Sequence, residues 1–203
     1  MSKFMDKIKE TARADKKTIV LAEGEERRTI DAAAQILKEG YANIILLGNE
    51  SKIKSMADGL DISEATIIDP DTSELTEELG NGLYELRKKK GMLPAQAAEK
   101  VKHVSYKGCE LVKTGRADGM VAGAVHATAD VMRSSLQTIK TAPDTKVVSA
   151  FFLMMVPDCE YGNNGTFVFS DCGLNEYPDS EKLAEIAISS SKSYKSLVGG
   201  EPK

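Results

Sequence analysis

The sequence predicts an α/β protein with three layers, in which a mostly parallel sheet carries helices on both faces. Short runs rich in β-branched residues alternate with longer stretches of helical periodicity, which is the pattern of βα units around such a sheet. The most apolar run, FFLMM at 151–155, suits a parallel strand that is covered on both faces, so we expect it to be core. With 203 residues, of which 41% are hydrophobic, the chain is long enough for one large domain or two small ones.

The first lobe is expected to cover residues 1–145. Its predicted strands lie at 18–23, 43–48, 65–69 and just after Gly119, and its predicted helices lie at 2–14, 25–40 (closed by Gly40), 51–57 and from Thr128 to about Thr141. Residues 74–114 are expected to form two or three helices, with breaks at 91–94 and near Ser105, because glycine and proline interrupt helices. The sequence APDT at 142–145 ends the last helix and predicts a domain boundary there.

The second lobe is expected to cover residues 146–203 and to be incomplete. A predicted strand at 146–156 is followed by Asn-Asn-Gly at 163–165, which tolerates the positive φ of a tight hairpin and so predicts an antiparallel pair. A predicted helix at 180–197 ends at Gly199, a suitable helix cap. Because a further strand normally follows a crossover helix in a parallel sheet, we expect the chain to be part of a longer protein.

Composition and charge argue against several classes of partner. The formal net charge is −4 and the pI is about 5.4, and acids lie between the lysines, so no continuous cationic face for nucleic acid arises. No stretch approaches the ~18 apolar residues of a membrane span, and no apolar signal region is present, so we expect a soluble protein without a membrane partner. The three cysteines form no CxxC pair and the two histidines have no ligand-like spacing, which argues against a metal site and for reduced thiols in the cytoplasm.

The strand-to-helix junction at 118–140 is the first candidate site. Thr128 is predicted to be the helix N-cap, and a helix N-terminus offers free N–H groups and a positive dipole end to a phosphate. Gly123 permits close backbone approach, and Arg133 can add a bidentate cationic fork. The alternative is structural: Thr128 only caps the helix, His126 is an ordinary loop residue, and Arg133 pairs with a surface acid.

Two further segments carry arginines that suggest ligand binding. Arg27 and Arg28 lie in the first turn of a predicted helix, where the dipole disfavours positive charge, although such residues are also common on solvated helices. Arg87 opens a run of four consecutive cations at a helix end, where the alternative is a merely solvated C-terminus. Neither GxGxxG nor GxxxxGK[ST] is present, so the usual dinucleotide and nucleotide phosphate motifs are missing.

Four segments together resemble one enzyme family. The segments LAEGEERRTIDAAAQIL, ELRKKKGM, ADGMVAGAVHATADVMRSSLQTIKT and GTFVFSDCGLNEYPDSEKLAEIA resemble phosphate acetyltransferase (phosphotransacetylase) over essentially the whole chain. The motifs GAVHATADVMRSSLQ and FVFSDCGLN are shared with the related phosphate butyryltransferases, and ELRKKKGM favours the acetyl form. The resemblance implies a two-domain α/β enzyme that forms homodimers and has its active cleft between the domains.

The resemblance also implies a reaction and its ligands. Family members move an acetyl group reversibly between coenzyme A and inorganic phosphate, so CoA is a substrate, no cofactor is permanently bound and no metal is required. By its match to the family motif, Arg133 is the active-cleft arginine that holds phosphate or the acyl phosphate, and Arg87 is associated with CoA. His126 and Thr128 border the same cleft, and Arg28 is a further candidate for substrate binding.

The catalytic base is the point at which the sequence departs from the family. In the family an aspartate takes the proton of the CoA thiol, and the thiolate attacks the acetyl carbonyl. This aspartate and its neighbouring serine and arginine match no position in residues 1–203, so we expect an N-terminal portion without the base. The alternatives are a phosphate butyryltransferase, a non-catalytic module that binds CoA or phosphate and, despite the missing glycines, an oxidoreductase on a related architecture.

Overall fold

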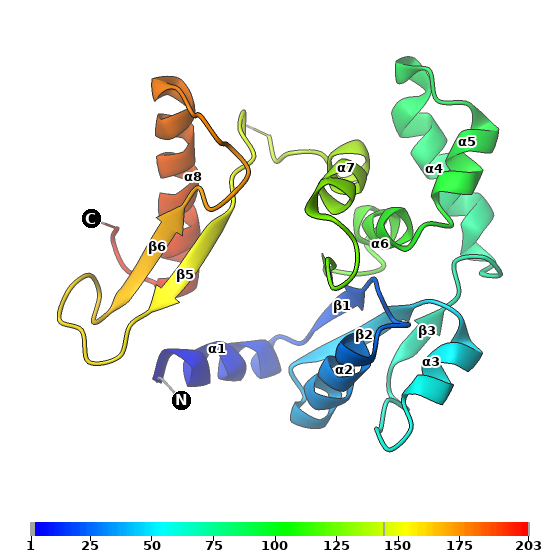
Figure 1. Cartoon of the computed structure of the whole chain (residues 1–203), viewed down its shortest axis with the longest axis horizontal. Helices are drawn as coiled ribbons and strands as arrows, with labels where there is room; N and C mark the ends of the chain where they lie inside the picture. The colour runs from blue at the N-terminus through cyan, green and yellow to red at the C-terminus, as the bar shows by residue number, and fades with distance from the viewer. Residues whose placement is uncertain (1–2, 144, 203) are drawn as a thin grey trace. The chain divides into compact units, whose positions relative to one another are not determined.

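A computed structural model of the chain describes residues 3–143 and 145–202 (Figure 1). The chain divides into two compact units, Met1–Lys140 and Thr141–Lys203, each with a sheet of its own. Ser2 of the first predicted helix and Asp144 of the predicted break at 142–145 lie outside the described residues. Within the described part of the chain, no helix is both long and apolar enough to cross a membrane.

The first unit is built on a parallel sheet of four strands. The strands are β1 (Lys17–Leu21), β2 (Ala42–Leu47), β3 (Thr66–Ile68) and β4 (Gly119–Val121). Their order is β3-β2-β1-β4, and Ile19 of β1 lies opposite both Ile44 of β2 and Gly119 of β4. The chain therefore adds strands on one side of β1 and then returns to the other side for β4. This reversal makes the β1–β4 boundary a topological switch point, where open α/β sheets bind ligands.

The core lies on both faces of this sheet, as the three-layer prediction requires. Successive side chains of β2 point to opposite faces, because the side-chain period of a strand is two residues. Ile44 and Leu46 join one buried cluster, and Ile45 and Leu47 join another. The helices around the sheet are α1 (Lys3–Ala14), α2 (Arg27–Glu39), α3 (Glu50–Met56), α4 (Leu75–Arg87), the 3-10 helix η1 (Lys88–Lys90), α5 (Pro94–Lys100), α6 (Val104–Lys113) and α7 (Thr128–Thr138).

The helices divide between the two faces. Helices α2 and α3 contribute Ile30 and Ile53 to the first buried cluster, whereas α4 and α6 contribute Leu79 and Leu111 to the second. Figure 1 shows α2 and α3 on one side of the sheet and α4 and α6 on the other. Burying each such aliphatic side chain contributes about 1.5–3 kcal/mol, so both faces are needed for a stable sheet. The predicted α/β fold with helices on both faces is confirmed.

Several helix ends differ from the sequence prediction. Gly40 caps α2 in the left-handed conformation, as predicted, but α2 begins only at Arg27, after an N-cap residue whose side chain makes no capping bond. The break expected near Ser105 lies just before it, because α6 begins at Val104. The N-cap of α6 is His103, whose ring nitrogen accepts a hydrogen bond from the Ser105 N–H, a role that is usually filled by Ser, Thr, Asp or Asn.

The second unit contains the predicted antiparallel hairpin. Strand β5 (Phe151–Met155) pairs antiparallel with β6 (Thr166–Ser170), and helix α8 (Ser180–Val198) follows. The tight turn forms at the expected Asn-Asn-Gly sequence: Asn164 and Gly165 have φ values of 49° and 80°, and the Thr166 N–H donates to the Asn163 carbonyl at 3.1 Å. Positive φ at both central residues is the mark of the hairpin-forming type I′ turn.

The prediction that FFLMM forms a buried parallel strand is wrong. Residues 151–155 form β5, which is shorter than the predicted strand at 146–156 and pairs antiparallel with one neighbour. Phe152 is 58% exposed and Met154 is 37% exposed. A strand becomes fully buried only when elements cover both faces of its sheet. Among the described residues of this unit a single helix, α8, follows a two-stranded sheet, so apolar side chains of β5 remain exposed.

Candidate functional site

The candidate site lies at the carboxyl ends of β1 and β4, which are neighbours in the sheet. Glu23 follows β1, and residues 122–127 connect β4 to α7. The Ala22 N–H donates to the Val121 carbonyl at 3.2 Å, so the two chain segments stay paired up to the loop. The loop therefore begins at the switch point of the sheet.

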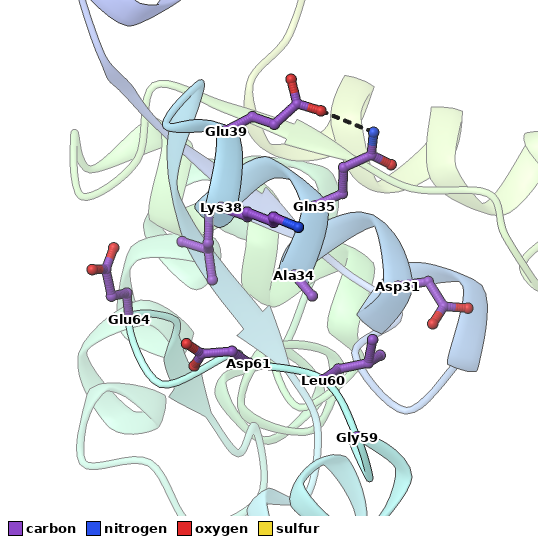
Figure 2. Close-up of a pocket in the computed structure, with 10 residues that line it drawn as sticks. Asp31, Ala34, Gln35, Lys38, Glu39, Gly59, Leu60, Asp61 and Glu64 are labelled. Atoms are coloured by element: carbon purple, nitrogen blue, oxygen red, sulfur yellow. Dashed lines mark hydrogen bonds between the residues drawn. The ribbon is translucent and has the colours of Figure 1, made fainter.

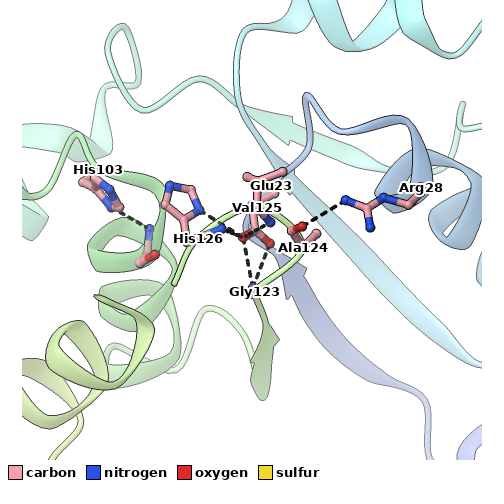
Figure 3. A network of polar contacts seen from close by, with 8 residues as sticks. Glu23, Arg28, His103, Gly123, Ala124, Val125 and His126 are labelled. Carbon is pink, nitrogen blue, oxygen red and sulfur yellow. Dashed lines mark hydrogen bonds and ion pairs between the residues drawn. The ribbon is translucent and has the colours of Figure 1, made fainter. Parts of the chain in front are cut away.

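The side chain of Glu23 holds this loop (Figure 3). Its carboxylate accepts the backbone N–H of Gly123 at 2.9 and 3.0 Å on its two oxygens, and it accepts the N–H groups of Val125 and His126 at 3.2 Å each. Glu23 is only 6% exposed. A buried carboxylate requires several donors to offset its lost hydration, and here the loop backbone supplies them. Sequence reasoning missed this residue.

The imidazole of His126 completes the shell around Glu23. Its Nδ1 lies 2.9 Å from Oε1 of Glu23. Burial alone would raise the pKa of Glu23, but the hydrogen bonds from the His126 side chain and from the loop backbone outweigh it and lower the pKa to about 2. At neutral pH the carboxylate is therefore ionised and can only accept. Nδ1 of His126 must consequently carry the proton in this contact, which leaves Nε2 as the other nitrogen.

The second histidine of the chain lies beside the first. The ring centroids of His103 and His126 are 4.9 Å apart in an edge-to-face arrangement. Nδ1 of His103 accepts the Ser105 N–H at 3.3 Å, which places the ring at the start of α6. The pKa of His103 is lowered by partial removal from water and then by the nearby His126, whereas Asp130 opposes this effect. His103 was also not identified from the sequence.

Arg28 reaches the same loop from helix α2. One guanidinium N–H of Arg28 donates to the Ala124 carbonyl at 2.9 Å, and its Nε donates to Glu26 at 2.6 Å. Its side chain is 70% exposed. The structure thus brings Arg28 to the loop that carries His126, as Figure 3 shows.

The predicted N-cap role of Thr128 is wrong. Thr128 is the first residue of α7, and the N-cap position is held by Ala127, which has no side-chain cap. At Gly123 an added Cβ would meet no protein atom within 4 Å, and the positive φ of 105° favours glycine there. The close approach of this backbone to a ligand stays a prediction. The loop therefore enters the helix one residue earlier than the sequence suggests.

Arg133 lies on α7 and pairs with an acid on the same helix. Its guanidinium is 2.5 Å from the Asp130 carboxylate, and its side chain is 55% exposed. The charge of Asp130 acts on His103, so this ion pair lies within electrostatic reach of that histidine. A surface ion pair of this kind contributes little stability and can be exchanged for a better anion.

Arg87 lies apart from this group of contacts. It ends α4, and its carbonyl accepts the Met92 N–H at 3.4 Å. Its Nε is buried and has no hydrogen-bond partner among the described residues. Within the described part of the chain, Arg87 makes no hydrogen bond or ion pair with Glu23, His126 or Arg28. The predicted CoA contact of Arg87 is thus not joined to the loop by any direct interaction.

A cavity elsewhere on the first unit has the wrong charge for phosphate. It has a volume of about 890 Å³ and lies between α2 and the segment before β3 (Figure 2). Its charged lining residues are Asp31, Lys38, Glu39, Asp61 and Glu64. Four carboxylates against one ammonium group repel a polyanion, so this cavity is not a site for phosphate or CoA. Among the described residues, no group of His, Cys, Asp and Glu side chains is arranged to hold a metal ion.

The chain matches proteins of one family over nearly its full length. A family model described as "Phosphate acetyl/butaryl transferase" matches residues 3–203. Phosphate acetyltransferases of Acetivibrio thermocellus and Clostridium acetobutylicum are 54% and 48% identical over 200 and 202 residues, each match covering 98% of this chain. The chain spans about 60% of the length of these curated relatives.

Solved structures give the same result. A phosphotransacetylase from Streptococcus pyogenes has a TM-score of 0.89 and 33% identity, with 98% of this chain and 60% of that chain covered. The EutD phosphotransacetylase from Staphylococcus aureus has a TM-score of 0.86 and 40% identity, with 96% and 58% covered. Sequence and fold therefore agree, and the chain belongs to the phosphate acetyl/butyryl transferase family.

Proposed function

We propose that the chain functions in phosphate acetyl transfer, the reversible exchange of an acetyl group between acetyl-CoA and inorganic phosphate that gives acetyl phosphate and CoA. The observation that carries the proposal is the loop at the switch point, which Glu23 anchors and which Arg28 contacts. It coincides with a match to proteins named phosphate acetyltransferase over 98% of this chain. In this reading, the loop and Arg133 form the phosphate-binding part of the site.

The chemistry of the substrates agrees with the residues available. Phosphate and acetyl phosphate carry two negative charges near neutral pH, and guanidinium groups bind phosphoryl oxygens with paired hydrogen bonds. Arg133 is exposed and, among the described residues, pairs only with Asp130, so a phosphoryl group can replace that partner. Arg28 presents a second exposed guanidinium, which donates to the Ala124 carbonyl of the loop. Thr128, as the first helical residue, adds a hydroxyl beside the N-terminus of α7.

The reaction then needs one bond exchange. The CoA thiolate attacks the carbonyl carbon of acetyl phosphate, a C–S bond forms, the C–O bond to phosphate breaks, and the phosphate leaves with its electron pair. Arg133 offsets the charge on the departing phosphate. The family resemblance assigns the thiol base to no residue of 1–203, so the roles proposed for Arg133, Arg87, His126, Thr128 and Arg28 are substrate binding and charge stabilisation.

We also propose the ligands, the location and the assembly that accompany this function. CoA acts as a substrate and product and not as a permanently bound cofactor. Arg87 contacts one of its phosphates through a guanidinium whose Nε has no partner within the described part of the chain. The chain works in the cytoplasm and pairs as a homodimer, and its domains divide near residue 145. Phosphate butyryl transfer is the second candidate, because the description of the matching family model names both acyl groups.

A binding and turnover experiment tests the proposed function. The 203-residue chain is purified, circular dichroism establishes that it is folded, and calorimetry measures binding of inorganic phosphate, CoA, acetyl-CoA and butyryl-CoA. We expect phosphate and acetyl-CoA to bind, with acetyl-CoA bound more tightly than butyryl-CoA. Thiol release from acetyl-CoA in the presence of phosphate is measured in the same samples; turnover would place a thiol base within 1–203. A folded chain that binds neither phosphate nor any CoA ester would disprove the proposal.

A further inference from the structure

We propose that Glu23 is a positioning residue for this reaction: it fixes the loop at 123–126 and holds His126 so that its Nε2 contacts the phosphoryl group of the substrate. The inference rests on the proposed function for the identity of the substrate. The positioning role of Glu23 follows from contacts within the chain and does not depend on the identity of the substrate.

The carboxylate of Glu23 already occupies the anion-binding part of the loop. Three backbone N–H groups of the loop, those of Gly123, Val125 and His126, donate to its carboxylate. Such a convergence of N–H groups normally binds an anionic ligand. Because Glu23 is buried, with 6% exposure, and accepts all three hydrogen bonds, these N–H groups are not available to a ligand. A phosphoryl group must therefore be bound by side chains at the rim of the loop.

The hydrogen bonds of His126 determine which atom of its side chain is available to a ligand. The ionised Glu23 requires a donor, so Nδ1 of His126 carries the proton at 2.9 Å. The His126 backbone N–H donates to the same oxygen, Oε1, at 3.2 Å. Two bonds from one residue to one carboxylate restrict both the backbone and the ring. Nε2 is left without an intramolecular partner among the described contacts and can accept a hydrogen bond from a hydroxyl group of the phosphoryl ligand.

The accessible ring of His126 lies near charged groups that suit a phosphoryl ligand. The His126 side chain is 26% exposed, so part of the ring is accessible to a ligand. His103 packs against it edge to face at 4.9 Å and limits rotation of the ring. Arg28 contacts the neighbouring residue of the loop, and the Asp130–Arg133 pair lies within electrostatic reach of His103. A phosphoryl group held by these arginines would meet Nε2 of His126.

Nitrogen NMR can test the positioning role without any substrate. The chain has only two histidines, so the ring signals of His126 and His103 can be assigned with a single His103→Asn variant. Long-range ¹H–¹⁵N spectra near pH 8 report which ring nitrogen carries the proton. We expect Nδ1–H in His126 and loss of this preference in Glu23→Ala, which removes the acceptor. A wild-type His126 that carries its proton on Nε2, or a preference unchanged in Glu23→Ala, would overturn the role of Glu23.

A pair of His126 variants tests the contact with substrate. Asparagine places its amide nitrogen near the position of Nδ1 and can still donate to Glu23, but it has no equivalent of Nε2. Glutamine places its amide near Nε2 and loses the Glu23 contact. Inorganic phosphate and acetyl phosphate are the probes, and binding is followed by calorimetry and by the ring signals of the wild-type chain.

The expected results separate positioning from mere stability. We expect His126→Asn to retain the wild-type melting temperature within about 2 °C and to bind phosphate about tenfold more weakly, since it lacks only the ligand contact. We expect Glu23→Ala to weaken phosphate binding by a similar factor, and phosphate to shift the ring signals of His126 more than those of His103. Wild-type phosphate affinity in His126→Asn would overturn the contact. If the wild-type chain binds no phosphate, the contact of His126 with substrate is overturned, and if it binds no CoA ester either, the proposed function fails as well. The substrate-free spectra decide the role of Glu23 in each case.

Discussion

At the scale of single residues, the site combines a buried anion with exposed cations. Glu23 is 6% exposed and satisfied by the loop, whereas Arg28 and Arg133 have side chains that are 70% and 55% exposed. The buried charge has a structural task, because a carboxylate is kept inside only with a full set of donors. The exposed charges are free to exchange partners, because their surface ion pairs are weak. This division explains why the arginines are the candidates for ligand binding and Glu23 is not.

Arg133 provides the prediction at this scale. We expect Arg133→Ala to weaken phosphate binding by about tenfold or more and Arg133→Lys to restore only part of the affinity, since an ammonium group cannot make a bidentate contact. Calorimetric titration with phosphate measures both. Arg116→Ala is the matched control, because Arg116 is held by Glu78 at 2.8 and 2.9 Å outside the site. Equal losses in Arg116→Ala and Arg133→Ala would show a general effect of net charge.

At the scale of elements, the start of α7 determines how the loop presents its residues. The helix begins at Thr128 behind Ala127, which occupies the N-cap with φ −65° and ψ 146° and has no side chain that can cap. The first N–H groups of α7 are therefore not satisfied by an N-cap side chain. The conformation at Ala127 is already the extended one that a capping residue adopts.

A substitution at Ala127 should therefore stabilise the chain. We expect Ala127→Ser to raise the free energy of unfolding by about 0.5–1 kcal/mol through a new bond to the first turn of α7, and Thr128→Ala to change it by less than about 0.5 kcal/mol. Urea denaturation followed by circular dichroism measures both variants. The reverse result, with Thr128→Ala destabilising and Ala127→Ser neutral, would restore Thr128 as the cap.

The hairpin between β5 and β6 depends on Gly165 in a different way. A Cβ at this position would lie 2.0 Å from the Val156 carbonyl oxygen, and the φ of 80° is unfavourable for other residues. We expect Gly165→Ala to destabilise the hairpin by about 2 kcal/mol or more, seen as faster amide exchange in β5 and β6. Gly200→Ala is the control, since its added Cβ would make only ordinary contacts at 3.6 Å. Unchanged exchange in Gly165→Ala would contradict the turn geometry.

At the scale of the whole molecule, buried ionisable groups make stability depend on pH. Glu110 in α6 is 1% exposed, and its Oε1 has no hydrogen-bond partner among the described residues. Burial raises its pKa to about 7 against the weaker opposing effect of Lys113. The native chain therefore binds this proton more tightly than the unfolded chain. The resulting stabilisation is present below about pH 4.5, and it is lost as the pH rises through about 7.

Glu110→Gln tests this linkage. The amide resembles the protonated acid and cannot ionise, so we expect the variant to be more stable than the wild type at pH 8.5, by roughly 1–3 kcal/mol, and to approach it near pH 5. Urea denaturation at pH 5, 7 and 8.5 measures the difference. Glu99→Gln serves as the control because Glu99 has a side chain that is 76% exposed and forms a surface pair with Lys102. A difference that is constant across the three pH values would contradict a raised pKa.

Much of the fold could be predicted because it depends on local patterns. Alternating strand-like and helical segments, the left-handed cap at Gly40 and the positive φ at Asn164 and Gly165 are all consequences of residue type over a few positions. The burial of residues 151–155 could not be predicted in the same way. Apolar composition states what a strand tolerates, but the number of elements that pack on it is decided elsewhere in the chain.

The candidate site shows the same division. The sequence by itself determined the family motifs and the arginines, because cationic side chains near a strand-to-helix junction favour phosphate wherever the chain places them. Only the tertiary structure decided that β1 and β4 are neighbours, and hence that Glu23 meets His126 across 103 positions of sequence at 2.9 Å. Strand order arises from packing both faces of the sheet. The residues that flank Glu23 in the sequence therefore do not predict which loop its carboxylate will bind.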